Sequence, residues 1–284
     1  MAQPPRPHVT PTTTSVSTTS LSTTDGVRLS CVDYGGDGPP VLLLHGLAGH
    51  AGEWASLAGM LTSHHRVLAY DARGHGAATR CPVDLSRAAH VRDAKAVMDQ
   101  LVGEETPLTL VGQSLGGLTA LLTAAAHPDR VEALVLVEAG PDGPAPELPE
   151  RIGSWMDSWP VPFASFEAAS AFFGGGEVGN AWAAGLASTP DGLHPRVDRD
   201  VMVATVAENA RRGFWDEWDR VCCPVLVVRG ASGSMRVEEA EQMRVRHPDT
   251  DVRIVPDASH DVHLDQPAAL YTALRAFLGQ PPAR

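Results

Sequence analysis

The chain has 284 residues, of which 43% are hydrophobic and 20% are charged. This is ordinary globular composition at a length that suits one α/β domain carrying an insertion, so global disorder and a small disulfide-bonded fold are excluded. With 22 basic and 34 acidic side chains the formal charge is −12, which repels phosphate backbones and anionic lipid surfaces, so we expect no nucleic-acid partner.

The first 24 residues are rich in Thr, Ser and Pro and contain few large apolar side chains. Because such a segment cannot offset its own ordering entropy, we expect residues 1–24 to form a mobile tail. The segment has no basic start followed by an apolar run of signal-peptide length, and nowhere do about 18 apolar residues follow one another. The sequence therefore predicts a cytoplasmic protein that does not bind a membrane.

From Val27 onward, short apolar runs alternate with stretches of helical period, which is the pattern of a parallel sheet with helices on both faces. Residues 27–34 are expected to form an antiparallel edge strand. Apolar faces at helical spacing predict covering helices over 88–101 and 267–278. The runs expected to form buried strands are 41–44, 66–70, 108–111, 133–137, 225–228 and 252–255.

Residues 141–219 interrupt this alternation. They begin with a Pro-rich stretch, contain no clear buried strand, and hold ten of the chain's fifteen aromatic residues. We therefore expect a helical cap inserted into a core made of residues 25–140 and 220–284, with the cap roofing an apolar pocket. The candidate pocket residues are Trp155, Trp159, Phe163 and Phe172. The alternative interpretation is that the two tryptophans, four residues apart, belong to the cap's own core.

The strongest local signal is Gly112-Gln113-Ser114-Leu115-Gly116, which follows the run at 108–111 and precedes a helix-like run at 118–126. A Gly-x-Ser-x-Gly turn between a strand and a helix is a nucleophile elbow, because small residues let a strained backbone pass close to neighbouring strands. The N-terminus of the helix directs partial positive charge at the serine, which favours an anionic intermediate. Ser114 is therefore the candidate nucleophile.

In the order of its motifs the sequence resembles the α/β-hydrolase family from about residue 25 to the C-terminus. His45-Gly46 follows the first buried run, the serine turn follows the third, and Ser259-His260 follows the last. The resemblance implies an α/β fold with a mostly parallel central sheet, helices on both faces and an inserted helical cap. It also implies that His260 is the catalytic base and that the backbone N–H groups of Leu47 and Leu115 form the oxyanion hole.

The acid is where the sequence departs from the family's common pattern. The acid usually follows the strand at 224–228, but this chain reads Gly-Ala-Ser-Gly-Ser-Met there, with no carboxylate before Glu238. Some family members place the acid one strand earlier, where Glu138 ends the run at 133–137. We therefore expect Glu138 to hold the imidazole of His260 in the productive tautomer. The alternative is that Glu138 caps backbone groups while His260 works with Glu238, Asp257 or no acid.

A serine nucleophile favours acyl transfer, since related dehalogenases and epoxide hydrolases use aspartate. We expect a serine hydrolase that cleaves a carboxylic ester or lactone of a small, apolar or aromatic substrate through an acyl-enzyme. One alternative is carbon-carbon bond hydrolysis, perhydrolysis or a cofactor-independent step in specialised metabolism on the same residues, and another is a non-enzymatic ligand receptor. We expect no cofactor, no metal, four free cysteines and a monomer or homodimer, because neither the histidines nor the cysteines show metal-ligand spacing.

Overall fold

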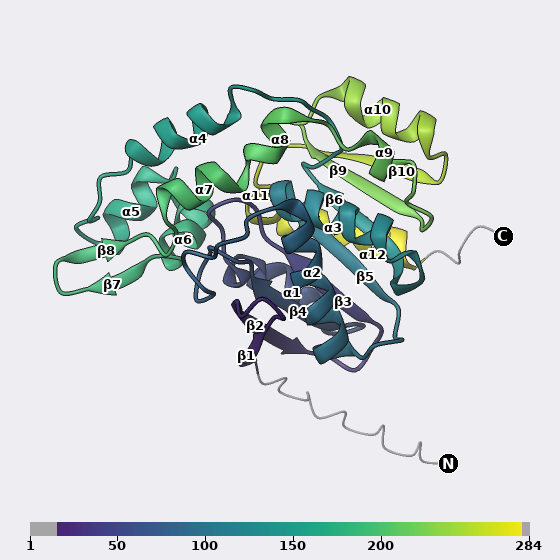
Figure 1. The fold of residues 1–284 in the computed structure, drawn as a ribbon, viewed down its shortest axis with the longest axis horizontal. Coiled ribbons are helices and arrows are strands. Elements are labelled where there is room, and N and C mark those ends of the chain that lie inside the picture. The colour runs from purple at the N-terminus through teal and green to yellow at the C-terminus, as the bar shows by residue number, and fades with distance from the viewer. Residues whose placement is uncertain (1–15, 280–284) are drawn as a thin grey trace, which may run out of the picture.

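A mostly parallel sheet forms the centre of the molecule in the computed structural model, which describes residues 16–279 (Figure 1). Its strands lie in the order β1-β2-β4-β3-β5-β6-β9-β10. Their bounds are β1 Ser17–Ser22, β2 Arg28–Gly35, β3 Pro40–Leu44, β4 Arg66–Asp71, β5 Leu108–Gln113, β6 Val131–Val137, β9 Val225–Gly230 and β10 Thr250–Val255. β2 pairs antiparallel with β1 and β4, and the other neighbouring pairs are parallel. The predicted parallel sheet is therefore confirmed, and each predicted run falls inside a strand. The run at 252–255 lies on the edge strand β10, where Arg253 and Ile254 are exposed, so the prediction of a buried strand is wrong there.

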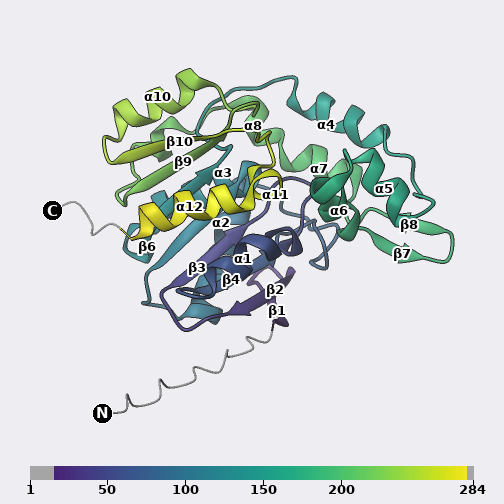
Figure 2. The ribbon, with the colours of Figure 1, turned by 180° about the vertical axis from the view of Figure 1, so that it is seen from behind.

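Helices cover both faces of this sheet. Outside residues 141–219 they are η1 Ala51–Trp54, α1 Ala55–Leu61, α2 Arg87–Val97, the π-helical η2 Met98–Val102, α3 Ser114–Ala126, η3 Pro128–Arg130, α10 Val237–Arg246, α11 Val262–Asp265 and α12 Pro267–Leu278. Figure 1 shows α2 and α3 in front of the sheet, and Figure 2 shows α1 and α12 on the opposite face. The helix predicted over 267–278 is confirmed, whereas the one predicted over 88–101 changes from α2 into η2 at Met98.

Successive residues of the inner strands point to opposite faces of the sheet, and both faces are buried. On β3, Leu42 belongs to the core cluster that contains Leu121 of α3. Its neighbour Leu43 belongs to the cluster on the other face, which contains Leu57 of α1. Because helices cover both faces, these strands are continuous apolar runs rather than an alternation of apolar and polar residues.

The N-terminal segment differs from the expectation of a mobile tail. Ser17–Ser22 pairs antiparallel with β2 along its whole length, and Leu21 is buried. Backbone N–H and C=O groups bond across strands whatever the side chains are, so a run rich in Ser and Thr can still form an edge strand. As a consequence β2, which was predicted to be the edge, is the second strand. The remainder of the predicted tail, residues 1–15, lies outside the described residues.

The inserted segment forms helices and one small hairpin, most of them to one side of the sheet, and its last helix packs on α3 (Figures 1 and 2). Its elements are α4 Leu148–Asp157, α5 Phe166–Phe172, α6 Gly176–Ala184, β7 Ala187–Thr189, β8 Gly192–His194, α7 Arg199–Thr205, α8 Ala207–Arg211 and α9 Trp215–Trp218. The antiparallel hairpin β7–β8 was not predicted. Phe214 and Trp218, at the last of these helices, are buried in the main core beside α3 rather than among the other inserted helices, so the predicted concentration of aromatics in a cap is wrong for these two residues.

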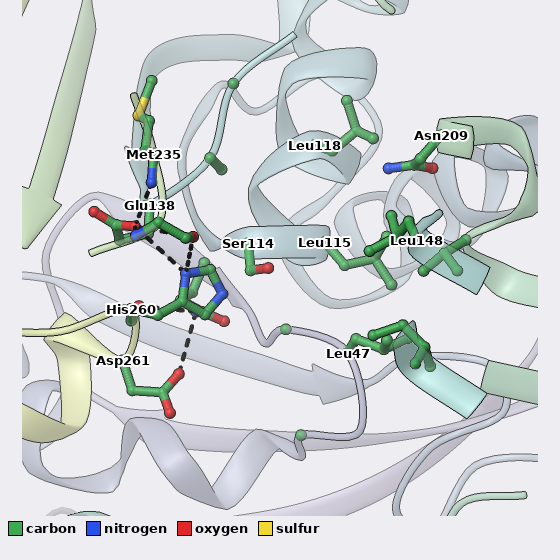
Figure 3. Close-up of a pocket in the computed structure, with 18 of the residues that line it drawn as sticks. Leu47, Ser114, Leu115, Leu118, Glu138, Leu148, Asn209, Met235, His260 and Asp261 are labelled. Carbon is green, nitrogen blue, oxygen red and sulfur yellow. Dashed lines mark hydrogen bonds and ion pairs between the residues drawn. The ribbon is translucent and has the colours of Figure 1, made fainter. Parts of the chain in front are cut away.

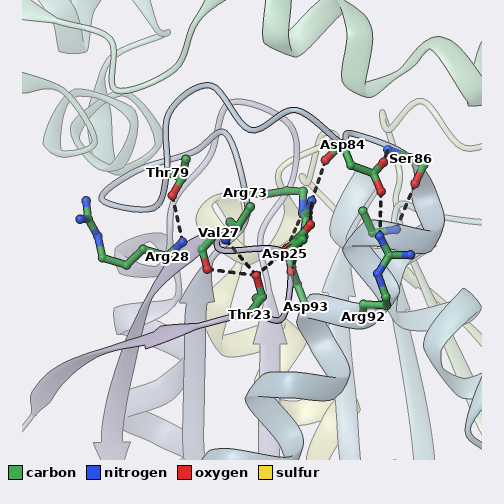
Figure 4. Close-up of polar contacts among 11 residues, drawn as sticks. Thr23, Asp25, Val27, Arg28, Arg73, Thr79, Asp84, Ser86, Arg92 and Asp93 are labelled. Carbon is green, nitrogen blue, oxygen red and sulfur yellow. Dashed lines mark hydrogen bonds and ion pairs between the residues drawn. The ribbon is translucent and has the colours of Figure 1, made fainter.

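A buried polar cluster fixes the loop that follows β4 (Figure 4). The guanidinium of Arg73 is inaccessible to solvent and donates to both carboxylate oxygens of Asp93 on α2, at 2.7 and 2.6 Å. It also donates to Asp25 in the turn before β2, at 3.0 Å. Beside this loop, Nε2 of His45 accepts from the backbone N–H of Ala72 at 3.0 Å. The end of β3, where His45 lies, is thereby held against the β4 loop.

Three further observations on the described residues concern thiols, metal ions and membranes. All four cysteines are free thiols. Within residues 16–279, no group of three or more His, Cys, Asp or Glu side chains is arranged to hold a metal ion. In the same range, no helix combines the length and the apolar character needed to cross a membrane.

Candidate active site

Ser114 stands at a sharp turn between β5 and α3, where its φ angle is 49°. Positive φ is strained for a residue with a side chain, and such strain persists only where the surroundings enforce it. Two glycines allow the close approach: a Cβ on Gly112 would lie 2.4 Å from the carbonyl oxygen of Gly116, and one on Gly116 would lie 2.3 Å from that of Leu44. The turn therefore has the geometry of a nucleophile elbow at the carboxyl edge of the sheet.

Glu138 ends β6, and backbone amides surround its buried carboxylate. Oε1 accepts from the N–H of Gly230 at 2.8 Å, and Oε2 accepts from the N–H groups of Ser234 and Met235 at 2.7 and 3.0 Å. Burial opposes ionisation, but hydrogen bonds from His260 and from these three amides outweigh it and hold the pKa of Glu138 below its usual value. The carboxylate is therefore ionised at neutral pH.

His260 lies on the loop after β10, with two oxygen atoms on the Nδ1 side of its ring. Nδ1 is 3.4 Å from Oε2 of Glu138 and 2.9 Å from Oγ of Ser234. Ser234 Oγ is itself 3.3 Å from the same carboxylate oxygen, so its hydroxyl lies between ring and acid. The alternative acids Glu238 and Asp257 are exposed, and within residues 16–279 neither is hydrogen-bonded to His260. The structure thus brings His260 together with Glu138 rather than with either alternative.

Ser114 and His260 line one cavity, whose volume is about 610 Å³ (Figure 3). In the described part of the chain no hydrogen bond joins the Ser114 hydroxyl to the His260 ring. Catalytic hydrogen bonds are often long or poorly aligned before substrate binds, and they tighten in the complex. The hydroxyl and the imidazole nevertheless reach the same space, from α3 and from the loop after β10.

Leu47 and Leu115, the predicted oxyanion residues, also line this cavity (Figure 3). Leu115 is the second residue of α3, and the first four N–H groups of a helix have no acceptor inside that helix. Leu47 lies between β3 and η1, directly before Ala48, whose φ angle is 60°. The two leucines therefore bring backbone from the loop after β3 and from the first turn of α3 to the cavity beside Ser114.

The cavity has both apolar and acidic walls. Its apolar side chains come from the core and from the inserted segment, and they are Leu47, Leu115, Leu118, Ala139, Leu148, Ile152, Trp155, Trp182, Val206 and Met235. Besides Glu138, its acidic side chains are Glu53, Asp142, Glu239 and Asp261. Burial raises the pKa of both Glu53 and Glu239 to about 7.

Of the four aromatic residues predicted to line the pocket, Trp155 does so. The prediction is wrong for Trp159, Phe163 and Phe172, which do not border this cavity among the described residues. Trp159 and Phe163 are buried in a cluster within the inserted segment, and the ring of Phe172 packs edge-on against Phe163 with centroids 5.5 Å apart. Trp159 and Phe163 thus pack in the core of the inserted segment, as the alternative interpretation held for Trp159, whereas Phe172 is 41% exposed.

Sequence reasoning did not single out three residues that the structure places at the site. Ser234 lies in the loop that was searched for a carboxylate, and a hydroxyl there gave no signal. Trp182 was one aromatic among ten. Asp261 directly follows His260, and its carboxylate accepts from the side-chain amide of Gln113 at 3.3 Å and from the indole N–H of Trp182 at 3.1 Å.

Fold and site together define a hydrolase built on a doubly covered parallel sheet. The chain belongs to the alpha/beta hydrolase family, whose model matches residues 41–273. The predicted family, fold and enzyme class are therefore confirmed.

Named relatives extend along most of the chain. The chain is 29% identical over 258 residues to the sn-1-specific diacylglycerol lipase ABHD11 of Mus musculus, and this match covers 84% of this chain and 81% of the relative. It is 29% identical over 278 residues to the esterase Rv0045c of Mycobacterium tuberculosis, covering 88% and 86%. Among solved structures, an E-2-(acetamidomethylene)succinate hydrolase matches with a TM-score of 0.82 at 23% identity, covering 93% of this chain and 100% of that one. This last likeness shows the fold.

Proposed function

We propose that the protein is a serine esterase that hydrolyses a carboxylic ester or lactone of a small, largely apolar substrate. The observation that carries the proposal is one shared cavity, reached by Ser114 at its strained turn and by His260 beside the buried, ionised Glu138. The relatives named as a lipase and an esterase support the ester bond as the target.

In the proposed reaction the Ser114 hydroxyl attacks the carbonyl carbon of the ester while Nε2 of His260 takes its proton. The carbonyl oxygen becomes an oxyanion, which the backbone N–H groups of Leu47 and Leu115 stabilise. The intermediate collapses, His260 returns the proton to the leaving alcohol, and an acyl-enzyme remains. Water then attacks the acyl carbon by the same proton transfers and releases the carboxylic acid.

Glu138 stabilises the imidazolium that forms in each of these steps. Nδ1 of His260 faces Glu138 Oε2 and Ser234 Oγ. Because backbone amides hold the carboxylate ionised, Glu138 favours the tautomer with hydrogen on Nδ1 and leaves Nε2 free to accept a proton. The acid acts on the base and does not itself carry the transferred proton.

An activated aryl ester and a serine-directed fluorophosphonate test the proposal. We expect a burst of phenol release, and phosphonate attached to the peptide that contains Ser114. Ser114→Ala should abolish labelling and lower kcat by about 10⁶, and Glu138→Gln should lower kcat by about 10³ to 10⁴ with the fold intact. Ser63→Ala, at an exposed serine after α1, is the matched control and should change neither readout.

The same experiment distinguishes ester hydrolysis from the alternative reactions. Labelling of Ser114 without turnover of any aryl ester would favour the carbon-carbon bond or perhydrolase reactions, which use the same nucleophile. Turnover that survives in Ser114→Ala would refute the acyl-enzyme. An unchanged rate in Glu138→Gln would assign the acid to another residue.

A further inference from the structure

The residue after His260 connects three parts of the molecule. Oδ2 of Asp261 accepts from the indole N–H of Trp182 at 3.1 Å, and its Oδ1 accepts from the side-chain amide of Gln113 at 3.3 Å. The same Gln113 amide donates to the backbone carbonyl of His260 at 3.1 Å. The Asp261 carboxylate, which Figure 3 shows beside His260, thus joins the inserted segment, the serine turn and the histidine loop.

The Gln113 end of this bridge is rigid. Gln113 is the last residue of β5, directly precedes Ser114 and is buried. Its Oε1 lies so close to Gly46 that a Cβ there would approach within 2.1 Å. Gln113 therefore has little freedom to follow a displaced histidine loop, and it serves as the fixed side of the bridge.

The Trp182 end belongs to α6 of the inserted segment. Its ring stacks on Phe173 with centroids 5.5 Å apart and meets Trp155 edge-on at 5.8 Å, which fixes the direction of the indole N–H. The same helix contacts the core again where the backbone carbonyl of Ala181 lies 3.2 Å from Nε2 of His50. Trp182 therefore contacts Asp261 through one directed hydrogen bond, and α6 also packs against α11, the helix that follows Asp261.

We propose that Asp261 is a positioning residue that couples the seating of α6 to the placement of His260. Within residues 16–279 no Lys or Arg pairs with Asp261, so its two N–H donors are the contacts that hold the carboxylate. Losing the Trp182 donor frees one oxygen and loosens the loop that carries the imidazole. The inference rests on the proposed role of His260 as the base.

Trp182→Phe removes the indole N–H and keeps an aromatic ring. The matched control is Trp159→Phe, because Trp159 lies in the same aromatic cluster, does not border the cavity, and has a buried indole nitrogen without an acceptor among the described residues. For an acetyl aryl ester, we expect Trp182→Phe to lower kcat about threefold to tenfold at unchanged KM. Trp159→Phe should leave both constants unchanged.

The coupling is tested by Asp261→Ala, which removes both acceptor oxygens, alone and combined with Trp182→Phe. If Trp182 acts through Asp261, the double variant loses no more activity than Asp261→Ala. Multiplied losses, or equal effects of Trp182→Phe and Trp159→Phe, would overturn the proposal. If Asp261→Ala does not fold, the comparison of the two tryptophan variants decides alone.

Hydrogen exchange gives a readout that does not depend on catalysis. Backbone amides of residues 256–265 should exchange faster in Trp182→Phe than in the unaltered protein, and at unchanged rates in Trp159→Phe. Unchanged exchange in both variants would overturn the coupling even if the protein proves to be an esterase. Faster exchange in a protein that hydrolyses no ester would refute the proposed function and leave the bridge intact.

Discussion

Two oxygen atoms compete for the Nδ1 side of the His260 ring, and they contribute differently. Ser234 Oγ is the nearer, at 2.9 Å, but it is neutral, whereas Glu138 Oε2 is charged and lies at 3.4 Å. A hydroxyl can accept from Nδ1–H and donate to a carboxylate at the same time. In the proposed mechanism Ser234 relays the charge of Glu138 to the ring, and Glu138 is the source of the electrostatic stabilisation.

Ser234→Ala tests this relay. We expect kcat to fall about tenfold at unchanged KM, because the ring keeps the charge of Glu138 but loses its shorter hydrogen bond. Steady-state kinetics on an aryl ester measures the effect. Ser234→Thr retains the hydroxyl and should restore most of the rate. An undiminished kcat in Ser234→Ala would contradict the relay, and a loss as large as that in Glu138→Gln would show that the acid acts wholly through Ser234.

Among single residues, the sequence predicts those whose role follows from their place directly after a strand. It misses those whose position depends on the path that a loop takes in space. Glu138 was identified because some members of the family place the acid directly after this strand, which the structure pairs with the elbow strand. Ser234 was not, because its position depends on how the loop after β9 wraps the carboxylate. That path needs Gly233, where a Cβ would come within 2.0 Å of Glu138 Oε1. A glycine next to a serine does not reveal such a requirement in the sequence.

Between elements, the ion pair of Arg73 with Asp93 joins the β4 loop to α2. Arg73→Met would leave the carboxylate of Asp93 buried without its partner, so we expect the free energy of unfolding to fall by about 3 to 5 kcal/mol. Urea denaturation measures the change. Arg92→Gln is the matched control, because its pair with Asp84 is exposed on both sides and should be worth less than about 1 kcal/mol. Similar losses in the two variants would contradict a special role for the buried pair.

A second contact between elements joins η1 to α11. The carboxyl of Glu53 and Nε2 of His263 lie 3.6 Å apart, and both side chains are buried. Burial raises the pKa of Glu53 to about 7 and lowers that of His263 to about 4, so burial disfavours the charged form of each group. The Glu53 carboxyl binds its proton more tightly in the folded than in the unfolded chain. Its contribution to stability is therefore present at low pH and is lost as pH rises toward 7.

Glu53→Gln should remove this pH dependence. Between pH 5 and pH 8, His263 stays neutral in the folded chain, so the variant isolates the carboxyl. We expect the stability of Glu53→Gln relative to the unaltered protein to improve by about 2 kcal/mol from pH 5 to pH 8. Denaturant titrations at the two pH values measure this difference. Glu104→Gln, at an exposed loop carboxyl, should show no such change. If the stability of Glu53→Gln varied with pH just as that of the unaltered protein does, the raised pKa of Glu53 would be contradicted.

Strands and helices could be predicted from the sequence where burial makes their residues apolar. β3 and β5 are apolar on both faces, and their runs stand out. β1 contains Ser and Thr, and only its backbone pairing shows that it is a strand. Phe214 and Trp218 show the opposite failure, because an aromatic residue signals burial without saying which core it enters.

Across the whole molecule, charge is distributed so that the cavity shares the net negative charge of the chain. Of its lining residues in the described part of the chain, five carry carboxyl groups and one, Arg151, carries a permanent positive charge. Glu138 and Asp261 accept N–H donors, and Asp142 pairs with Arg236. These contacts hold the carboxylates in place without reversing the sign of the local field. An anionic substrate group would therefore enter against like charge.

This field predicts a preference between matched substrates. An aryl ester whose acyl chain ends in a carboxylate should have a kcat/KM at least about tenfold below that of the same ester ending in a neutral methyl ester. This difference in kcat/KM should narrow as added salt screens the charges of the cavity. It should widen from pH 6 to pH 8, because Glu53 and Glu239, whose pKa values burial raises to about 7, ionise over that interval. Arg151→Gln should widen it further. A preference for the carboxylate ester that disappears in Arg151→Gln would instead identify an anion subsite at Arg151.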